Sequence, residues 1–156
     1  MLITQFTYLF DSMYRVAQFI GFHARKKDNM NILFVMIGGF FGSISRYSLG
    51  EWIHFGNGFP FGTLYINLIG CFILGWFLTF ASRSKRVKNE WSLLIGTGFI
   101  GSFTTFSTFS VETLQLFQKG FLWQALLYIL ASTILGILLA FVGHKIAHLR
   151  TVEAEN

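Results

Sequence analysis

Four separate runs of apolar residues, each about as long as a bilayer is thick, constrain the fold of this chain most. A transmembrane helix needs about 20 mostly apolar residues. The runs extend from Ile32 to about Ile53, from about Gly62 to Ala81, from Trp91 to about Phe117 and from about Phe121 to Val142. Only 12% of the 156 residues are charged, against about 25% in soluble domains. The pattern predicts an all-α membrane protein with four transmembrane helices.

The third run contains an unusual stretch, residues 96–110, that is rich in glycine, serine and threonine as well as phenylalanine. Glycine weakens a helix interior by about 1 kcal/mol relative to alanine. Non-helical backbone survives at membrane depth only where protein buries it or where it lines a wet cavity. We therefore expect a broken helix within an ion or solute pathway, with Phe103, Phe106 and Phe109 at one-turn spacing.

The chemistry of this stretch suits ions of either sign. Aromatic rings are positive at their edges, so the phenylalanines, together with hydroxyl groups, can surround a small anion. Carbonyl groups that are freed where a helix breaks can instead bind a cation. One segment could therefore hold a structural cation and also line an anion pathway.

Two polar side chains in other spans have both a structural and a functional interpretation. Asn67 lies inside the second run, with Thr63 and Cys71 four residues to either side. Its carboxamide needs partners in hydrocarbon, which predicts either a bond between helices or a donor that lines the pathway. Arg46 lies near the end of the first run, where it is either a snorkelling anchor or a fixed positive charge at a vestibule. Cys71 itself is expected to pack as a small apolar residue.

Further polar groups lie on the third and fourth runs. Tyr128 and Ser132 share a helix face and predict either a hydroxyl track or ordinary bonds between helices. Glu112 follows the phenylalanine stretch and is expected to pair with a basic residue or to be a solvated charge at a helix end. His144 and His148 have metal-capable spacing, but without a third ligand they predict an exposed tail.

The ends of the chain fall outside the expected channel domain, residues 30–148. Residues 1–29 have apolar residues at helical spacing followed by basic ones, the reverse of a secretory signal. They predict either an amphipathic helix in the membrane interface or, if Met30 is the start, a non-essential extension. Residues 149–156 are expected to form a polar tail.

Charge asymmetry predicts the topology. With four spans, ten of the twelve lysines and arginines lie on the side that holds both termini, and from Met30 onward the ratio is six to two. The positive-inside rule places both termini in the cytoplasm of a plasma-membrane protein. Because the basic residues flank apolar spans, the net charge of +5 indicates anionic lipid rather than nucleic acid as the contact.

Small residues recur at four-residue spacing in two of the runs, as Gly38 and Gly42 in the first and as Ser132, Gly136 and Ala140 in the fourth. Such patterns allow helix backbones to approach closely. Because four short helices can hardly enclose a pore, we expect close packing between copies, in a dimer or a larger assembly.

Three blocks of this sequence resemble the Fluc family of fluoride channels, also called CrcB, over about residues 30–142. They are GGFFGSISRY (38–47), GTLYINLIG (62–70) and TGFIGSFTTFSTFSVE (97–112). The resemblance implies a fluoride-selective channel, not an enzyme, built as an antiparallel dimer with two pores. It also implies a central structural sodium ion, which is not transported.

Site residues follow from the same resemblance. It implies sodium-binding main-chain carbonyls at Gly101 and Thr104, pore phenylalanines at Phe106 and Phe109, and a pore amide at Asn67.

The resemblance also implies a vestibule or structural charge at Arg46 and Glu112, and a polar track at Tyr128 and Ser132. Where the family's track continues with hydroxyls, this chain has Gly136 and Ala140.

Two features leave alternatives open. An antiparallel homodimer needs a chain that inserts both ways, whereas this charge bias favours one orientation, so the partner is either a second copy or an oppositely oriented homologue. The other candidate function is a small proton-coupled exporter, which generally needs a carboxylate deep in the membrane. Here Glu51, Glu90 and Glu112 lie near span ends, which argues against proton coupling. A membrane enzyme would need a nucleophile with a base, or a metal site, at one depth.

Overall fold

The computed structural model of this chain describes residues 28–53, 58–83 and 87–153. These residues form helices and connections, and four helical segments are long and apolar enough to cross a membrane. The prediction of an all-α protein with four spans is therefore confirmed. Residues 1–27, which include most of the predicted amphipathic helix or extension, lie outside the described residues.

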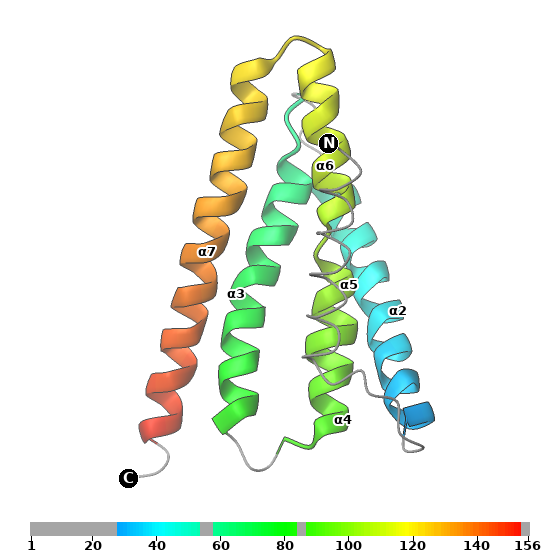
Figure 1. The fold of residues 1–156 in the computed structure, drawn as a ribbon, viewed down its shortest axis with the longest axis vertical. Coiled ribbons are helices and arrows are strands. Elements are labelled where there is room, and N and C mark those ends of the chain that lie inside the picture. The colour runs from blue at the N-terminus through cyan, green and yellow to red at the C-terminus, as the bar shows by residue number, and fades with distance from the viewer. Residues whose placement is uncertain (1–27, 54–57, 84–86, 154–156) are drawn as a thin grey trace, which may run out of the picture. The chain divides into compact units, whose positions relative to one another are not determined.

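The spans are built from seven helical segments, shown in Figure 1. They are α2 (Asp28–Trp52), α3 (Phe61–Arg83), α4 (Asn89–Ser92), η1 (Leu93–Ile100), α5 (Gly101–Phe103), α6 (Phe106–Gln118) and α7 (Leu122–Glu153). The third span therefore consists of four of these segments in succession, whereas each of the other spans is one helix.

The segment η1 is a π-helix of eight residues that contains Gly96 and Gly98. π-Helices are rare, usually occur as a single turn and are often found at functional sites. The sequence indicated irregular backbone in this part of the third span but did not predict its π-helical form. The irregular part of the span thus begins before the phenylalanine stretch.

The first span packs against the third through the predicted glycine step. A Cβ atom at Gly38 would collide with the carbonyl oxygen of Leu94, and one at Gly42 with the carbonyl oxygen of Phe99. The close approach that the spacing predicts is confirmed, but it occurs within one chain rather than between copies. The step holds α2 directly against η1, so it also positions the break that follows.

The α3 and α7 helices also pack with their backbones in close contact, and Figure 1 shows them side by side. A Cβ atom at Gly75 would collide with the carbonyl of Ala140, and one at Gly143 with the carbonyl of Phe72. The small residues of the fourth span therefore close the seam between α3 and α7. Nearer the middle of the span, a Cβ at Gly136 would lie 3.4 Å from Cys71 Sγ.

The fourth helix is longer than its apolar run. It continues from Val142 to Glu153, because helical hydrogen bonding does not stop where hydropathy falls. The predicted tail around His144 and His148 is therefore helical, with His144 exposed and His148 partly buried. The Thr79 hydroxyl donates to the Gly75 carbonyl and lies 2.8 Å from His144 Nδ1, so the imidazole is the donor in that second contact.

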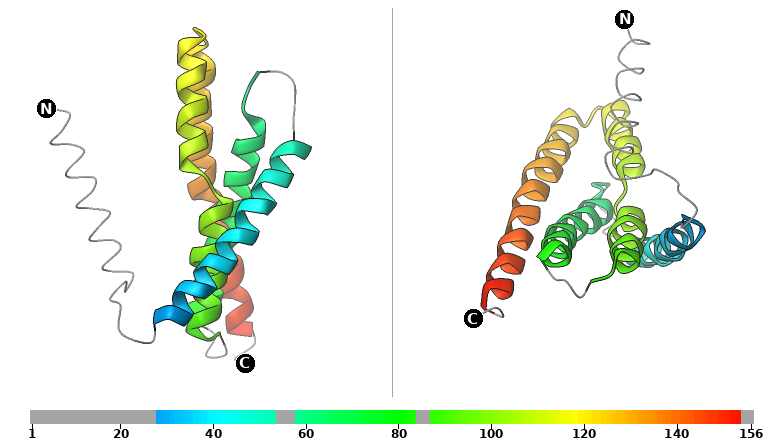
Figure 2. Two further views of the ribbon diagram at one scale, coloured as in Figure 1. Left: turned by 90° about the vertical axis from the view of Figure 1, so that its right-hand side faces the viewer. Right: turned by 60° about the horizontal axis from the view of Figure 1, so that its bottom comes forward.

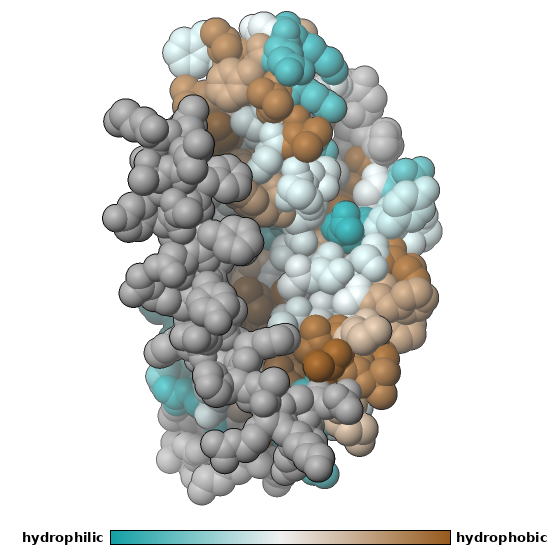
Figure 3. All heavy atoms as spheres, turned by 45° about the vertical axis from the view of Figure 1, so that its right-hand side comes forward, coloured by the Kyte–Doolittle hydropathy of each residue, from teal (hydrophilic) through white to brown (hydrophobic). Residues whose placement is uncertain are grey.

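The described surface is predominantly apolar. Figure 3 shows brown and pale residues over most of the described surface of one face, with hydrophilic residues in scattered patches. Large apolar side chains of α7 such as Leu127, Ile137 and Phe141 are exposed. A small buried core joins α3, α6 and α7 through Leu64, Leu116 and Tyr128. The exposed apolar faces are suited to lipid or to another helical chain.

The glycine contact between α2 and η1 can be tested with Gly38→Ala. The added methyl group meets the Leu94 carbonyl, so the backbones must separate, and overpacking of this kind costs about 1–3 kcal/mol. Unfolding by SDS in mixed micelles should occur at lower detergent fraction than for the wild type. Gly39→Ala is the matched control, since its new Cβ would be 3.9 Å from the nearest atom. Equal effects of both substitutions would contradict this account.

Candidate functional site

The candidate site is centred on the two residues between α5 and α6. Thr104 has φ −76° and ψ 151°, and Thr105 has φ −141° and ψ 117°, so both are extended rather than helical. The left view of Figure 2 shows this extended connection within the third span. It leaves the main-chain groups at the adjacent helix ends without their usual helical partners.

The Asn67 carboxamide of α3 supplies two of the replacement partners. Its Nδ2 donates to the Thr105 carbonyl at 3.0 Å, and its Oδ1 accepts from the Thr105 amide at 2.8 Å. The predicted bond between helices is therefore present. Since Nδ2 carries two hydrogens and one of them binds Thr105, the geometry leaves the second available for the cavity that Asn67 lines.

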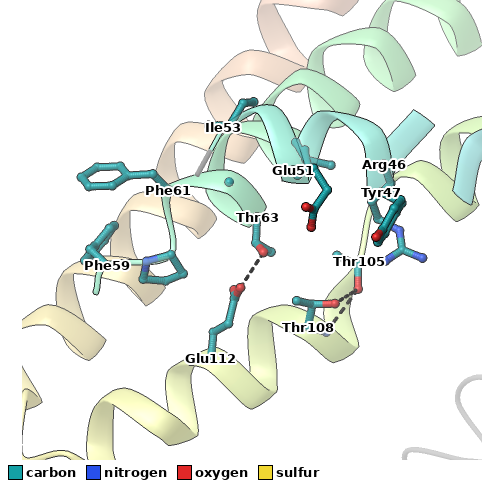
Figure 4. A pocket seen from close by; sticks show the side chains of 14 residues that line it. Arg46, Tyr47, Glu51, Ile53, Phe59, Phe61, Thr63, Thr105, Thr108 and Glu112 are labelled. Atoms are coloured by element: carbon teal, nitrogen blue, oxygen red, sulfur yellow. Dashed lines mark hydrogen bonds between the residues drawn. The ribbon is translucent and has the colours of Figure 1, made fainter. Parts of the chain in front are cut away.

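The side chain of Thr105 caps the next helix. Its Oγ1 accepts from the Thr108 amide at 3.2 Å and donates to Thr108 Oγ1 at 3.0 Å, as Figure 4 shows. A threonine at the N-cap stabilises a helix start by satisfying an amide of the first turn. Our sequence analysis gave Thr105 no role, although the Thr-x-x-Thr spacing before α6 is the pattern that could have indicated this cap.

Arg46 of α2 also binds the main chain near the break. Its Nε donates to the Ser102 carbonyl at 3.2 Å. Arg46 thereby replaces the main-chain amide that would donate to this carbonyl in a continuous helix. Arg46 also lines a cavity, where its guanidinium group contributes a positive charge. The contact with Ser102 binds Arg46 to the third span, and the vestibule charge stays a prediction.

The hydrogen bonds around the break leave two particular carbonyls without their usual donors. In an α-helix the Gly101 carbonyl would accept from the Thr105 amide and the Thr104 carbonyl from the Thr108 amide. Here the Thr105 amide donates to Asn67, and the Thr108 amide donates to the Thr105 side chain. Main-chain carbonyl oxygens of this kind are suitable ligands for a hard cation such as Na⁺, so the donor set fits the ion.

A cavity of about 320 Å³ lies beside the break, and we call it the Asn67 cavity. It brings together polar and aromatic groups from α3, α6, α7 and the extended connection. Its lining residues are Asn67, Cys71, Leu74, Thr104, Thr105, Phe106, Phe109, Ser132 and Thr133. Four of the five side chains that were predicted to line a pore therefore lie around one space.

The two phenylalanines of this cavity differ in their surroundings. Their ring centroids are 6.0 Å apart. Phe109 is half-buried and packs against Tyr128, with centroids 4.9 Å apart, whereas Phe106 is 80% exposed. A single chain therefore forms only one side of the surroundings of Phe106.

Ser132 places a hydroxyl group on the α7 side of the cavity. Its Oγ is buried and has no hydrogen-bond partner among the described residues. A buried hydroxyl without a partner is costly, so a polar occupant of the Asn67 cavity would relieve that cost. Of the two residues of the predicted polar track, Ser132 therefore lines the cavity.

Tyr128 lies behind Phe109 and is not among the residues that line the Asn67 cavity. It is fully buried, and its hydroxyl donates to Glu112 Oε2 at 2.7 Å. Thr63 donates to the other oxygen, Glu112 Oε1, at 2.8 Å. Glu112 therefore joins α3, α6 and α7 through two hydroxyl donors, neither of which is the basic residue that we expected. It is also not simply a solvated helix-end charge, because both of its oxygens accept hydrogen bonds within the chain.

A second cavity, of about 280 Å³, lies between α2, α3 and α6 and is called the Arg46 cavity. Figure 4 shows Arg46, Thr63, Thr105, Thr108 and Glu112 around it. Thr105 of the extended connection lines both cavities. The second cavity is lined by the guanidinium group of Arg46 and the carboxylate of Glu112, so it contains groups of both charges.

Comparisons with known proteins agree with this architecture. Residues 33–144 match the family model described as CrcB-like protein, Camphor Resistance (CrcB). Three similar relatives are named fluoride-specific ion channel FluC. The relative from Oceanobacillus iheyensis is 56% identical over 75% of this chain and 91% of its own length. That from Acidobacterium capsulatum is 45% identical over 73% and 93%, and that from Methanocaldococcus jannaschii is 45% identical over 74% and 93%.

The family match covers all four spans apart from their outermost residues, and it includes both cavities and the extended connection between α5 and α6. The relatives are named for ion conduction and not for a catalysed reaction. The chain therefore belongs to the CrcB family.

Proposed function

We propose that this chain forms a fluoride-selective channel that lowers cytoplasmic fluoride by passive export. Its relatives are named fluoride-specific ion channels. The observation that carries the proposal is the Asn67 cavity, where an amide, a hydroxyl without a partner and two phenylalanines meet. A small anion can accept hydrogen bonds from Asn67 Nδ2 and Ser132 Oγ while aromatic edges complete its surroundings.

Passive conduction is sufficient for the proposed activity. Fluoride enters cells as the neutral acid and is trapped as the anion at cytoplasmic pH, so a selective pore lets the anion leave down its electrochemical gradient. The membrane potential contributes about 2.3 kcal/mol per charge for each 100 mV. No side chain has to change protonation during this process.

A structural sodium ion is part of the proposal. The Gly101 and Thr104 carbonyls would hold it, because the amides that normally occupy them donate elsewhere. Hard cations generally take about six or more oxygen ligands, so two carbonyls from one chain leave an ion under-coordinated. An antiparallel partner that contributes the same pair would bring the ion to the centre of a dimer.

Two features support a dimer of this kind. Phe106 is 80% exposed although it borders the Asn67 cavity, and a partner chain would supply the missing wall. The strong asymmetry of lysine and arginine favours one orientation with cytoplasmic termini. We therefore propose that the partner is an oppositely oriented homologue, with a second copy of this chain as the alternative.

The proton-coupled exporter has less support. Glu51 and Glu112 both line the Arg46 cavity, and neither lines the Asn67 cavity. The two oxygens of Glu112 accept from Thr63 and Tyr128. A proton carrier that used Glu112 would have to rearrange these hydrogen bonds in each transport cycle.

Fluoride efflux from liposomes is the direct test. Vesicles that contain the complete channel, either this chain alone or this chain coexpressed with an oppositely oriented homologue, are loaded with potassium fluoride and should release fluoride when valinomycin is added. Chloride-loaded vesicles of the same composition should release nothing. Release that needs a proton gradient instead of valinomycin would favour the exporter.

The same liposomes distinguish the two kinds of partner. Release from the single purified chain would contradict an obligatory homologue. Activity that appears only after coexpression with an oppositely oriented homologue would support a heteromeric channel, and inactivity of the coexpressed pair as well would contradict the proposed function.

Phe106→Ala tests the aromatic wall of the pathway. Loss of the ring removes positive edges from the Asn67 cavity, so fluoride efflux should fall at least about tenfold, which corresponds to about 1.4 kcal/mol. Because the Phe106 side chain is mostly exposed, thermal stability should change little. Phe117→Ala is a matched control on the same helix, since Phe117 lines neither cavity. An equal decrease for the two variants would argue against a specific aromatic wall.

A further inference from the structure

The carboxamide of Asn67 competes with the helix for the main-chain groups of Thr105. If it released them, the Thr105 amide could again donate to the Gly101 carbonyl and extend α5. The same applies at the next turn, where the Thr105 hydroxyl keeps the Thr108 amide from the Thr104 carbonyl. Two side-chain contacts therefore keep two carbonyl oxygens available to a ligand.

We propose that Asn67 is a positioning residue for the cation site: by holding the peptide groups of Thr105, it keeps the Gly101 carbonyl open and sets the affinity for sodium. The proposal rests on the sodium ion of the proposed function. Asn67 would then have two roles, since it lines the proposed anion pathway and also holds the cation site. The anion pathway and the cation site would be connected through this one side chain.

The geometry of Asn67 carries this inference. A residue that served only as an anion donor would need Nδ2 directed at the cavity and would make no use of Oδ1. Here both polar atoms bind the same residue, at 3.0 and 2.8 Å, and they come from a different span. These two hydrogen bonds satisfy the amide and the carbonyl of Thr105 and also fix their positions.

The adjacent part of α3 fits the break as closely. A Cβ atom at Gly70 would collide with the Thr104 side chain, so α3 leaves room for one residue of the connection and binds the next through Asn67. Thr104 is further held by its own hydroxyl, which donates to the Ile100 carbonyl at 3.0 Å. Both residues of the extended connection are therefore fixed by contacts that do not involve the two open carbonyls.

The test compares sodium binding in Asn67→Ala and Ser132→Ala. Both substitutions remove a polar group from the same cavity, but only the first removes the contacts with Thr105. The proteins are purified in sodium-free N-methylglucamine buffer, and the melting temperature is then measured against sodium concentration. Tightly retained sodium is determined in parallel by atomic emission, since a ligand that binds only the folded state raises stability by mass action.

We expect the sodium concentration for half-maximal stabilisation to rise at least tenfold in Asn67→Ala and to stay within twofold of the wild type in Ser132→Ala. If the wild type retains sodium through purification, the expected result is loss of that sodium from Asn67→Ala alone. An unchanged half-maximal concentration or retained sodium in Asn67→Ala would overturn the proposal. A wild-type protein that neither contains nor responds to sodium, both alone and coexpressed with an oppositely oriented homologue, would also overturn it.

A second pair of variants keeps the proposal testable if Asn67→Ala does not fold. Thr105→Ala leaves Asn67 and the main chain in place but frees the Thr108 amide to occupy the Thr104 carbonyl, so sodium affinity should again fall at least tenfold. Thr105→Ser retains the capping oxygen and should restore wild-type affinity. Equal sodium responses in these two variants would contradict the inference, because it requires that the Thr105 hydroxyl keep the Thr108 amide away from the Thr104 carbonyl.

These measurements do not depend on fluoride transport. Sodium-dependent stability without fluoride efflux, even from the coexpressed pair, would contradict the proposed transport function and leave the positioning proposal intact. Fluoride conduction by the wild type, together with unchanged sodium affinity in Asn67→Ala, would contradict the positioning proposal and leave the transport function intact. The two proposals can therefore fail separately.

Discussion

Pairing of main-chain polar groups at membrane depth is the constraint on which this structure depends. A break in a transmembrane helix exposes amides and carbonyls that water cannot satisfy in hydrocarbon. The third span nevertheless contains two extended residues, Thr104 and Thr105. The fold accommodates them because side chains from neighbouring spans replace the lost helical partners: Arg46 binds the Ser102 carbonyl and Asn67 binds both groups of Thr105.

These replacements explain why the helices must pack so closely. The Nε atom of Arg46 can reach the third span because Gly38 and Gly42 hold α2 against the backbone of η1. On the opposite side, the absence of a side chain at Gly70 lets α3 approach Thr104. The glycines of the spans thus determine which polar side chains reach the break, so backbone packing and site chemistry depend on one another.

Much of this architecture could be predicted from the sequence, because span length and hydropathy are local properties. Asn67 and Arg46 stood out as polar residues in apolar runs, and each was found bonded to another span. The partners of Glu112 were not predicted, because Thr63 and Tyr128 lie on other helices and meet it only after packing. The π-helix η1 and the end of α7 were also missed: periodicity does not distinguish helix types, and helices can continue beyond an apolar run.

The placement of Thr105 has a consequence for how the two cavities and the cation site can influence one another. Thr105 lines both cavities, its amide determines whether the Gly101 carbonyl is open, and its hydroxyl does the same for Thr104. A cation bound to those carbonyls would oppose extension of the helix through the connection and so preserve the shape of both cavities. Since coupling between two sites is reciprocal, occupation of the Asn67 cavity by an anion that favours the same geometry would strengthen cation binding. If the proposed sodium ion binds there, the extended connection is the element through which that ion would maintain a pathway for another ion without entering it.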